Sequence, residues 1–274
     1  KLEDLSFSLQ ETSFAMLEVI PEIEKVEVAG SGFVNFWIAD DAARAEFGKI
    51  AAQKDFGKGD SLQGKKVMVE YTDPNPFKEF HIGHLMTNTI GESLARIHEA
   101  AGAEVLRANY QGDIGLHVAN SVWGMMQTKD DMPSPAATLA EKMAFLGRAY
   151  VRGVKAYKED PAAKEAVEAI NKKIYDRSDE EVNEFYDRGR GWSLEYFETL
   201  YARFGTKFVH YFFESEMGPE GLKIVKAHPE VFVPSEGAII FPGEQYGLHT
   251  RVFINKFGLP TYEAKELSLN KLKF

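Results

Sequence analysis

The chain has 274 residues, of which 44% are hydrophobic and 27% charged, with no cysteine and a formal net charge of −10 at pH 7. This length allows one large or two smaller domains. The lack of cysteine excludes disulfides and cysteine-based zinc sites, and the negative charge argues against broad nucleic-acid binding by the whole chain, but not against a local basic surface. No hydrophobic run has the length of a membrane span and no secretory signal pattern is present, so we expect a cytoplasmic protein without a membrane partner.

The first part of the chain predicts a helix followed by a β-hairpin. Hydrophobic residues recur at helical spacing within 1–20, and Pro21 would end that helix. Extended runs at 26–28 and 33–38 flank a glycine-rich turn, which predicts a hairpin.

A second helix and a flexible junction follow the hairpin. Asp40 is a candidate N-cap for a helix over 41–53. Glycines are frequent between 57 and 64, where we place a domain boundary. We therefore expect a small α+β N-terminal domain at 1–59 and a larger domain at 60–274.

The next part of the chain has the order strand, helix, strand. The runs 65–71 and 105–110 predict the strands, and Gly102 is well placed to end the helix between them. Such a unit predicts a parallel sheet with a right-handed crossover. Ligands of such sheets bind beyond the carboxyl ends of the strands, where the segments 72–84 and 109–115 both fall.

A long helical stretch follows. Residues 136–205 predict about three helices, with breaks at Asp160 and near Ser178, which has the spacing of a capping box with Glu181. The stretch is too long for a simple crossover, so we expect a helical insertion over about 128–205.

The last part of the chain predicts extended structure. The run 208–213 predicts a strand, and the runs 238–241 and 252–254 predict a hairpin. The whole pattern predicts an α/β fold with a parallel sheet.

Two histidines flank a glycine where the strand 65–71 leads into its helix. Gly83 lets an anion approach the backbone, and the start of the helix offers free N–H groups. His81 and His84 add donors that can stabilise charge on a transferring phosphoryl group. The motif predicts an enzyme that acts on a nucleoside triphosphate. The alternative is a pair of histidines that only cap a helix.

Three segments carry sequence signatures. Residues 74–84 read PNPFKEFHIGH, residues 107–115 read RANYQGDIG, and residues 260–266 read PTYEAKE. The first contains every fixed letter of the pattern P-N-x-x-K-x-x-H-x-G-H of arginyl-tRNA synthetases, and the other two resemble that family's next blocks in the same order. The resemblance extends over roughly residues 1–274.

This resemblance implies a class I synthetase fold with a Rossmann-type catalytic domain. It implies a ligase that activates L-arginine with ATP, accompanied by Mg²⁺, and transfers it to tRNA(Arg). His81, His84 and Lys78 would act on the ATP phosphates, and Gly83 would let the adenine ring approach. The arginine carboxylate attacks the α-phosphate, so the protein supplies positioning and charge stabilisation rather than a nucleophile or a metal cage. Taken alone, Lys78 is equally consistent with a solvent-exposed loop lysine.

The resemblance also implies an arginine site. Tyr262 and Glu266 lie four residues apart, on one helical face, and would pack on and pair with the guanidinium. Glu214 matches a further acidic position near the substrate. Asn75 and Asn109 would hold the α-amino and carboxylate groups or the loop around them. The family more often has aspartate where this chain has Glu266, and for either glutamate taken singly a surface carboxylate is the alternative.

Two family features do not occur in the chain, namely the second class I signature K-M-S-K-S and the helical domain that reads the anticodon. We therefore expect a fragment that is a poor catalyst by itself, with a partial N-terminal domain of the kind that contacts tRNA in this family. Two alternatives stay open. One is another H-x-G-H enzyme, such as a different class I synthetase or a nucleotidylyltransferase, and the other is a non-catalytic binding module that kept the fold.

Overall fold

The computed structural model describes residues 20–30 and 33–274. The chain divides into two compact units, with the boundary between Gly59 and Asp60. The helix predicted within 1–20 lies outside the described residues. In the part of the chain that is described, no helix is both long and apolar enough to cross a membrane.

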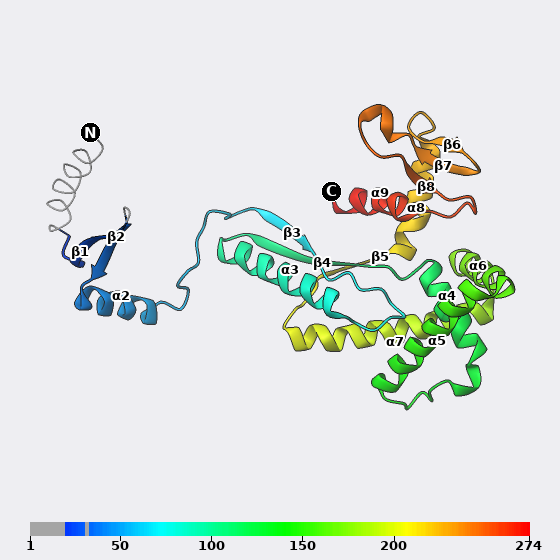
Figure 1. Ribbon diagram of the computed structural model, residues 1–274, viewed down its shortest axis with the longest axis horizontal. Coiled ribbons are helices and arrows are strands. Elements are labelled where there is room, and N and C mark those ends of the chain that lie inside the picture. Colours follow the sequence, from blue (N-terminus) through cyan, green and yellow to red (C-terminus); the bar gives the residue numbers. More distant parts are fainter. Residues whose placement is uncertain (1–19, 31–32) are drawn as a thin grey trace. The chain divides into compact units, whose positions relative to one another are not determined.

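The first unit contains a hairpin and a helix (Figure 1). The predicted hairpin is confirmed, because β1 (Ile23–Ala29) pairs antiparallel with β2 (Phe33–Ile38). Helix α2 (Asp40–Ala52) follows, but the predicted cap is wrong by one residue. Ala39 is the N-cap, and Asp40 already lies in the first helical turn, where a carboxylate is favourable beside the positive end of the helix dipole.

The second unit is built on a three-stranded parallel sheet with the order β3 (Lys66–Glu70), β4 (Glu104–Gln111), β5 (His210–Phe213). Helix α3 (Ile82–Ala100) connects β3 to β4, so the predicted strand–helix–strand unit is confirmed. Gly102 follows the helix with a φ of 94°, which accounts for the glycine.

Different helices cover the two faces of this sheet. Alternate residues of β4 face α8 (Glu214–Ala227) and α9 (Tyr262–Lys273), where Tyr110 packs with Met217 and Leu269. On the other face lie α3, which reaches Arg107 of β4 through two glutamates, and α7 (Glu180–Phe204), which packs on Tyr71. Figure 1 shows α3 and α7 on one side of the strands and α8 and α9 on the other.

A helical layer connects β4 to β5. It contains α4 (Leu116–Gln127), α5 (Leu139–Glu159), α6 (Pro161–Asp176) and α7, so the three predicted helices are confirmed. Helix α4 packs in the same core, which includes Val122, Leu146 and Ile174.

The predicted capping box at the start of α7 is wrong. Asp179 is the N-cap, and its carboxylate accepts from the backbone N–H of Val182 and pairs with Lys173. Asp179 therefore makes the capping bond that the prediction gave to Ser178, and the helix begins one residue later.

Helices α4 and α5 cross at very short range because each presents a glycine to the other. A Cβ atom on Gly124 would lie 2.0 Å from the carbonyl oxygen of Ala149, and one on Gly153 would lie 1.9 Å from the carbonyl oxygen of Asn120. No side chain fits at either position without moving a backbone.

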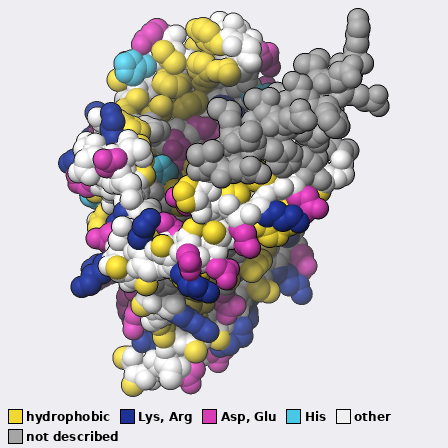
Figure 2. All heavy atoms as spheres, turned by 90° about the vertical axis from the view of Figure 1, so that its left-hand side faces the viewer, with side chains coloured by type: hydrophobic (Ala, Val, Ile, Leu, Met, Phe, Trp, Pro, Cys, Tyr) yellow, Lys and Arg dark blue, Asp and Glu magenta, His cyan; other side chains and the backbone are white. Residues whose placement is uncertain are grey.

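A small antiparallel sheet precedes α9. The predicted hairpin of β7 (Ala238–Phe241) and β8 (Arg251–Ile254) is confirmed, and β6 (Val233–Ser235) adds a third strand that the sequence did not predict, because it is short and contains a proline. Figure 2 shows hydrophobic side chains gathered at the upper end of the molecule, at the height of this sheet in Figure 1.

Helix α3 exposes an apolar stripe. Its members are spaced four or three residues apart, so they share one helical face. The exposed members are Ile82, Met86, Ile90, Leu94 and Ile97. Strand β3 beside this helix pairs on one side only, with β4, within the described residues.

Candidate active site

The loop between β3 and α3 has an uncommon backbone. Thr72, Asp73 and Phe77 have φ angles of 79°, 44° and 67°, a region that side chains other than glycine seldom adopt. Each residue in this backbone conformation destabilises the fold by about 1–3 kcal/mol, so the conformation persists only where the surroundings fix it. The surroundings fix Phe77, because its ring is fully buried and its backbone N–H donates to the hydroxyl of Ser193 in α7 at 2.8 Å.

Asp73 fixes this loop to the sheet. Its Oδ1 accepts from the backbone N–H of Tyr110 in β4 at 2.7 Å. Burial raises the pKa of the Asp73 carboxyl to about 7, and the hydrogen bond from Tyr110 offsets this rise only in part. Nearby Glu70 and Glu266 raise the pKa further, whereas Lys273 lowers it.

The elevated pKa of Asp73 predicts a pH-dependent stability. Because the folded state holds this proton after the unfolded state has lost it, the free energy of unfolding falls as pH rises from 3.8 to about 7. Asp73→Asn keeps an oxygen acceptor for Tyr110 and cannot ionise. Because Asp73 is also partly exposed to solvent, which weakens the effect, we expect the variant to be more stable than the natural chain by only about 0.5–1 kcal/mol at about pH 8, with the difference vanishing near pH 4. Urea unfolding at several pH values measures this, and a difference independent of pH would contradict it.

The two histidines begin α3 and orient each other. The Nδ1 atom of His81 accepts from the N–H of Gly83 at 3.1 Å, and the Nδ1 atom of His84 accepts from the N–H of His81 at 3.4 Å. Their rings stack 3.7 Å apart. Because both Nδ1 atoms accept, each neutral ring carries its hydrogen on Nε2, which leaves two donors available.

Gly83 is required by this capping arrangement. A Cβ atom at this position would lie 2.9 Å from Cε1 of His81.

Burial, followed by the charges of His81 and Lys78, lowers the pKa of His84 to about 4. His84 is therefore neutral at physiological pH, and Lys78 lies near enough to influence it. The ammonium of Lys78 also lies 4.8 Å from the ring centroid of Tyr150 in α5.

A second cluster surrounds Gly112, directly after β4. A Cβ atom there would lie 2.3 Å from Oδ1 of Asn75 and 3.4 Å from Oε1 of Glu214, so these two predicted residues meet over the glycine. Glu214 does not stand alone, because its Oε2 pairs with Nζ of the buried Lys265 at 2.6 Å. Although burial lowers it, the pKa of Lys265 is raised overall by Tyr175 and Glu214.

Tyr262 and Glu266 lie in the first turns of α9, next to this cluster. The ring of Tyr262 lies 6.5 Å from that of Tyr110. Burial, and then hydrogen bonding to Glu266, raises the pKa of the Tyr262 hydroxyl. The hydroxyl of Tyr110 is buried and has no hydrogen-bond partner among the described residues.

Asn109 does not join this cluster. It is fully buried, and its Nδ2 donates to the carbonyl oxygen of Tyr71 at 2.9 Å, so it holds the start of the loop. Because successive residues of a strand face opposite sides, Asn109 lies on the α3 and α7 face, away from Tyr110.

Three further residues of the site were not predicted from the sequence. Lys265 is described above. His117 of α4 donates from Nε2 to the carbonyl oxygen of Gly112 at 2.9 Å, and burial lowers its pKa to about 4. Asp113 is fully buried and accepts from Arg190 at 2.8 Å and from Ser215, next to Glu214. The roles of Asp113 and Lys265 depend on contacts with residues distant in sequence, so the local sequence pattern could not predict them.

The arrangement has two chemically different ends. His81, His84 and Lys78 offer hydrogen-bond donors and positive charge at the start of α3. Glu266 and Tyr262 offer an anion and an aromatic face at the start of α9. Such an arrangement suits an anionic group at one end and a cationic group at the other.

Comparison with known proteins matches the part of the chain that contains these site residues. Residues 47–273 match the model of the family described as tRNA synthetases class I (R), catalytic domain. The chain belongs to the class I arginyl-tRNA synthetase family. An arginine–tRNA ligase of Geobacter sp. (strain M21) is 31% identical over 261 residues, which are 92% of this chain and 45% of that protein. An arginine–tRNA ligase of Fusobacterium nucleatum is 29% identical over 255 residues, which are 92% of this chain and 43% of that protein. This synthetase chain spans less than half the length of these relatives.

Solved structures of arginyl-tRNA synthetases share the fold. The enzyme of Thermus thermophilus matches with a TM-score of 0.60 at 24% identity, over 92% of this chain and 42% of that one. The enzyme of Plasmodium falciparum matches with a TM-score of 0.58 at 19% identity, over 93% of this chain and 44% of that one. The predicted class I synthetase fold is thereby confirmed.

Proposed function

We propose that this chain carries the adenylation site of an arginine–tRNA ligase. The carboxylate of L-arginine attacks the α-phosphate of ATP, pyrophosphate leaves, and the arginyl group then passes to the 3′ end of tRNA(Arg). The proposal is carried by the row of side chains along the carboxyl edge of the sheet, with imidazole donors at one end and the Tyr262–Glu266 pair at the other.

The ATP side of the site works through fixed donors. His81 and His84 donate from Nε2 to phosphate oxygens, and Lys78 adds a positive charge. Because the Nδ1 atoms already cap α3, the rings need no reorganisation as charge develops on the phosphorus. Among the described residues no three His, Asp or Glu side chains form a group that could hold a metal ion, so the phosphates and water would supply most ligands of Mg²⁺.

The arginine side recognises a planar cation. Glu266 pairs with the guanidinium, and Tyr262 packs on its face. Asn75 and the Glu214–Lys265 pair bind the α-amino and carboxylate groups above Gly112. Asn109 acts indirectly by holding the loop that carries Asn75.

Calorimetric titration of the chain with L-arginine, citrulline and lysine tests this site. Citrulline keeps the shape of arginine without its charge, so we expect only arginine to bind well. Glu266→Gln removes the anion and is expected to weaken arginine binding by about 10- to 100-fold.

Glu263→Gln is the matched control, because Glu263 lies in the first turn of the same helix and only reaches Arg251 at 3.9 Å. We expect it to leave arginine binding unchanged. If the folded chain bound citrulline as well as arginine, or if both variants lost affinity equally, the assignment of Glu266 would be wrong.

A further inference from the structure

Tyr110 of β4 carries a hydroxyl that is buried and unpaired. The residue is 5% exposed, and its hydroxyl oxygen has no hydrogen-bond partner among the described residues. A buried polar group without a partner is uncommon in folded proteins, because burial removes its bonds to water. A polar ligand that supplies the missing bond accounts for such a group.

The strand register places this hydroxyl beside the arginine side of the site. Ala108, two residues before Tyr110 in β4, lies beside Glu70 of β3 in the parallel sheet. Because alternate residues of a strand share a face, Glu70 and Tyr110 both face α8 and α9. On this face the ring of Tyr110 lies 6.5 Å from that of Tyr262 in α9. The hydroxyl is therefore next to the residues proposed for the guanidinium.

Three carboxylates act on the Tyr110 hydroxyl. Burial, followed by the charges of Glu214 and Glu266, raises the pKa of this hydroxyl above the usual range of a tyrosine. Tyr262 and Glu70 raise the pKa further. The hydroxyl is therefore neutral at physiological pH, and it can donate one hydrogen bond and accept another. A neighbouring carboxylate can take its hydrogen, which leaves the oxygen to accept from a cation.

Two of these three carboxylates already have a cation. Glu214 pairs with Lys265 at 2.6 Å. Glu70 pairs with Lys273 at 2.5 Å. Glu266 makes no ion pair within the described part of the chain. One negative charge therefore remains beside the hydroxyl, which matches a ligand group with a single positive charge.

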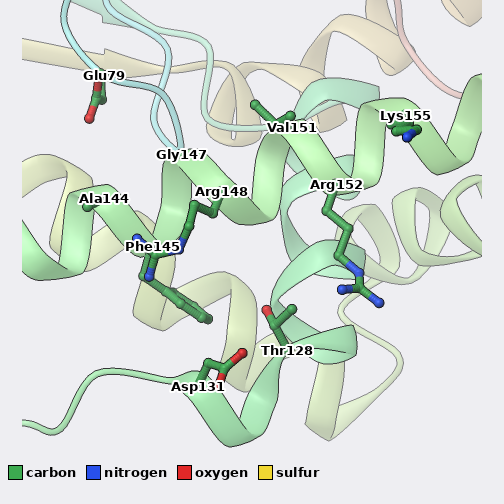
Figure 3. A pocket seen from close by; sticks show the side chains of 10 residues that line it. All are labelled: Glu79, Thr128, Asp131, Ala144, Phe145, Gly147, Arg148, Val151, Arg152 and Lys155. Atoms are coloured by element: carbon green, nitrogen blue, oxygen red, sulfur yellow. The ribbon is translucent and has the colours of Figure 1, made fainter.

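A cavity of about 830 Å³ along α5 has the opposite electrostatic character, and Tyr110 does not line it. Figure 3 shows the charged side chains of its lining, namely the cations Arg148, Arg152 and Lys155 and the carboxylates Glu79 and Asp131. Because the cations outnumber the carboxylates, this cavity disfavours a guanidinium. The surroundings of Tyr110 favour one.

We propose that Tyr110 is a specificity-determining residue for arginine, with its hydroxyl oxygen accepting one N–H of the guanidinium while its hydrogen is donated to a neighbouring carboxylate. The inference rests on the proposed function and deepens it. A guanidinium has five N–H donors in fixed directions, more than the carboxylate of Glu266 alone can bind. Tyr110 supplies an acceptor for one of the remaining donors. The ammonium of lysine lacks this planar geometry and cannot match both acceptors in the same way.

Calorimetric titration of Tyr110→Phe with L-arginine tests the proposal on the full 274-residue chain. The variant loses one oxygen and keeps the ring that packs with Met217 and Leu269. We expect arginine to bind about 10-fold more weakly, because a charged N–H is left without its acceptor. The melting temperature of the variant is expected to equal or exceed that of the natural chain, because an unpaired buried group is removed.

Tyr211→Phe is the matched control, because it removes a tyrosine hydroxyl from the neighbouring strand β5. Tyr211 packs on the opposite face of the sheet, and its hydroxyl donates to Glu198 of α7 at 2.7 Å. We expect this variant to bind arginine like the natural chain.

Nuclear magnetic resonance separates direct contact from a structural role. The chain has 11 tyrosines, and labelling their Cζ atoms with ¹³C gives a signal for each. The signal that is missing from Tyr110→Phe belongs to Tyr110. We expect L-arginine to shift this signal, because the hydroxyl gains a partner, and to leave the signal of Tyr211 in place.

Each other outcome overturns the proposal. Unchanged arginine affinity in Tyr110→Phe, or a Tyr110 signal that stays in place when arginine binds, would exclude the contact. Equal loss of affinity in both tyrosine variants, or a lower melting temperature of Tyr110→Phe, would show a structural role instead. If the natural chain bound no arginine, the proposed function would fail together with this inference. Normal arginine binding that depends on Glu266 but not on Tyr110 would contradict this inference alone.

Discussion

Replacing Asp113 by alanine is expected to lower the free energy of unfolding by about 3–5 kcal/mol. Its buried carboxylate accepts from the N–H and the hydroxyl of Ser215 at 2.9 and 2.7 Å and pairs with Arg190 at 2.8 Å. The alanine variant leaves Arg190 without its anion and two donors of Ser215 without an acceptor, and such losses are larger than the net value of the bonds. Urea unfolding followed by circular dichroism measures the change.

Asp187→Ala is the control on the same helix as Arg190. Asp187 pairs with Arg177 through both oxygens, but both side chains are about half exposed, so we expect a loss of less than about 1 kcal/mol. Asp113→Asn keeps one acceptor and should fall between the two. Similar losses for Asp113→Ala and Asp187→Ala would show that the buried network contributes no more than a surface pair.

Gly153→Ala and Gly191→Ala are expected to change stability in opposite directions, although both add one methyl group inside a helix. The new Cβ at 153 would meet the carbonyl oxygen of Asn120 at 1.9 Å, so α4 and α5 must separate, at a cost of about 1–3 kcal/mol. The new Cβ at 191 in α7 has no neighbour within 4 Å, so this variant gains about 0.5–1 kcal/mol of helix propensity.

Thermal and urea unfolding of the two variants, compared with the natural chain, measure this difference. Because the propensity gain is common to both sites, their difference isolates the cost of separating the two backbones. If Gly153→Ala were as stable as Gly191→Ala, the short α4–α5 crossing would be incorrect.

Much of the fold could be predicted because it depends on local sequence pattern. The strands on either side of α3 carry short hydrophobic runs, 67–69 and 105–106, and the helices after Asp160 and Asp179 carry clear periodicity and caps.

The errors at Asp40 and Ser178 are single-residue shifts with different causes. At α7 two adjacent polar residues, Ser178 and Asp179, can each cap the helix, and the local pattern does not choose between them. At α2 the N-cap is Ala39, which makes no side-chain cap, so no polar residue marks the true start of the helix.

The candidate site was predictable only in part. The histidines and Asn75 lie in one contiguous motif, so the sequence locates them. The pairing of Glu214 with Lys265 joins residues 51 positions apart, and the contact of Asp113 with Ser215 joins residues 102 apart. Such contacts depend on how the sheet and helices pack, so spacing along the chain carries no sign of them. Asn109 illustrates the same limit, because strand alternation turns it away from the cluster over Gly112.

The apolar stripe of α3 has a consequence for how this chain behaves at high concentration. The net charge of −10 makes copies repel one another at low ionic strength, which keeps the stripe in water. Salt screens that repulsion, and strongly hydrated anions such as sulfate also increase the tendency of apolar surface to become buried. The colloidal stability of the chain therefore depends on a balance between its charge and one helical face, and low-salt, sulfate-free solutions favour the dispersed form.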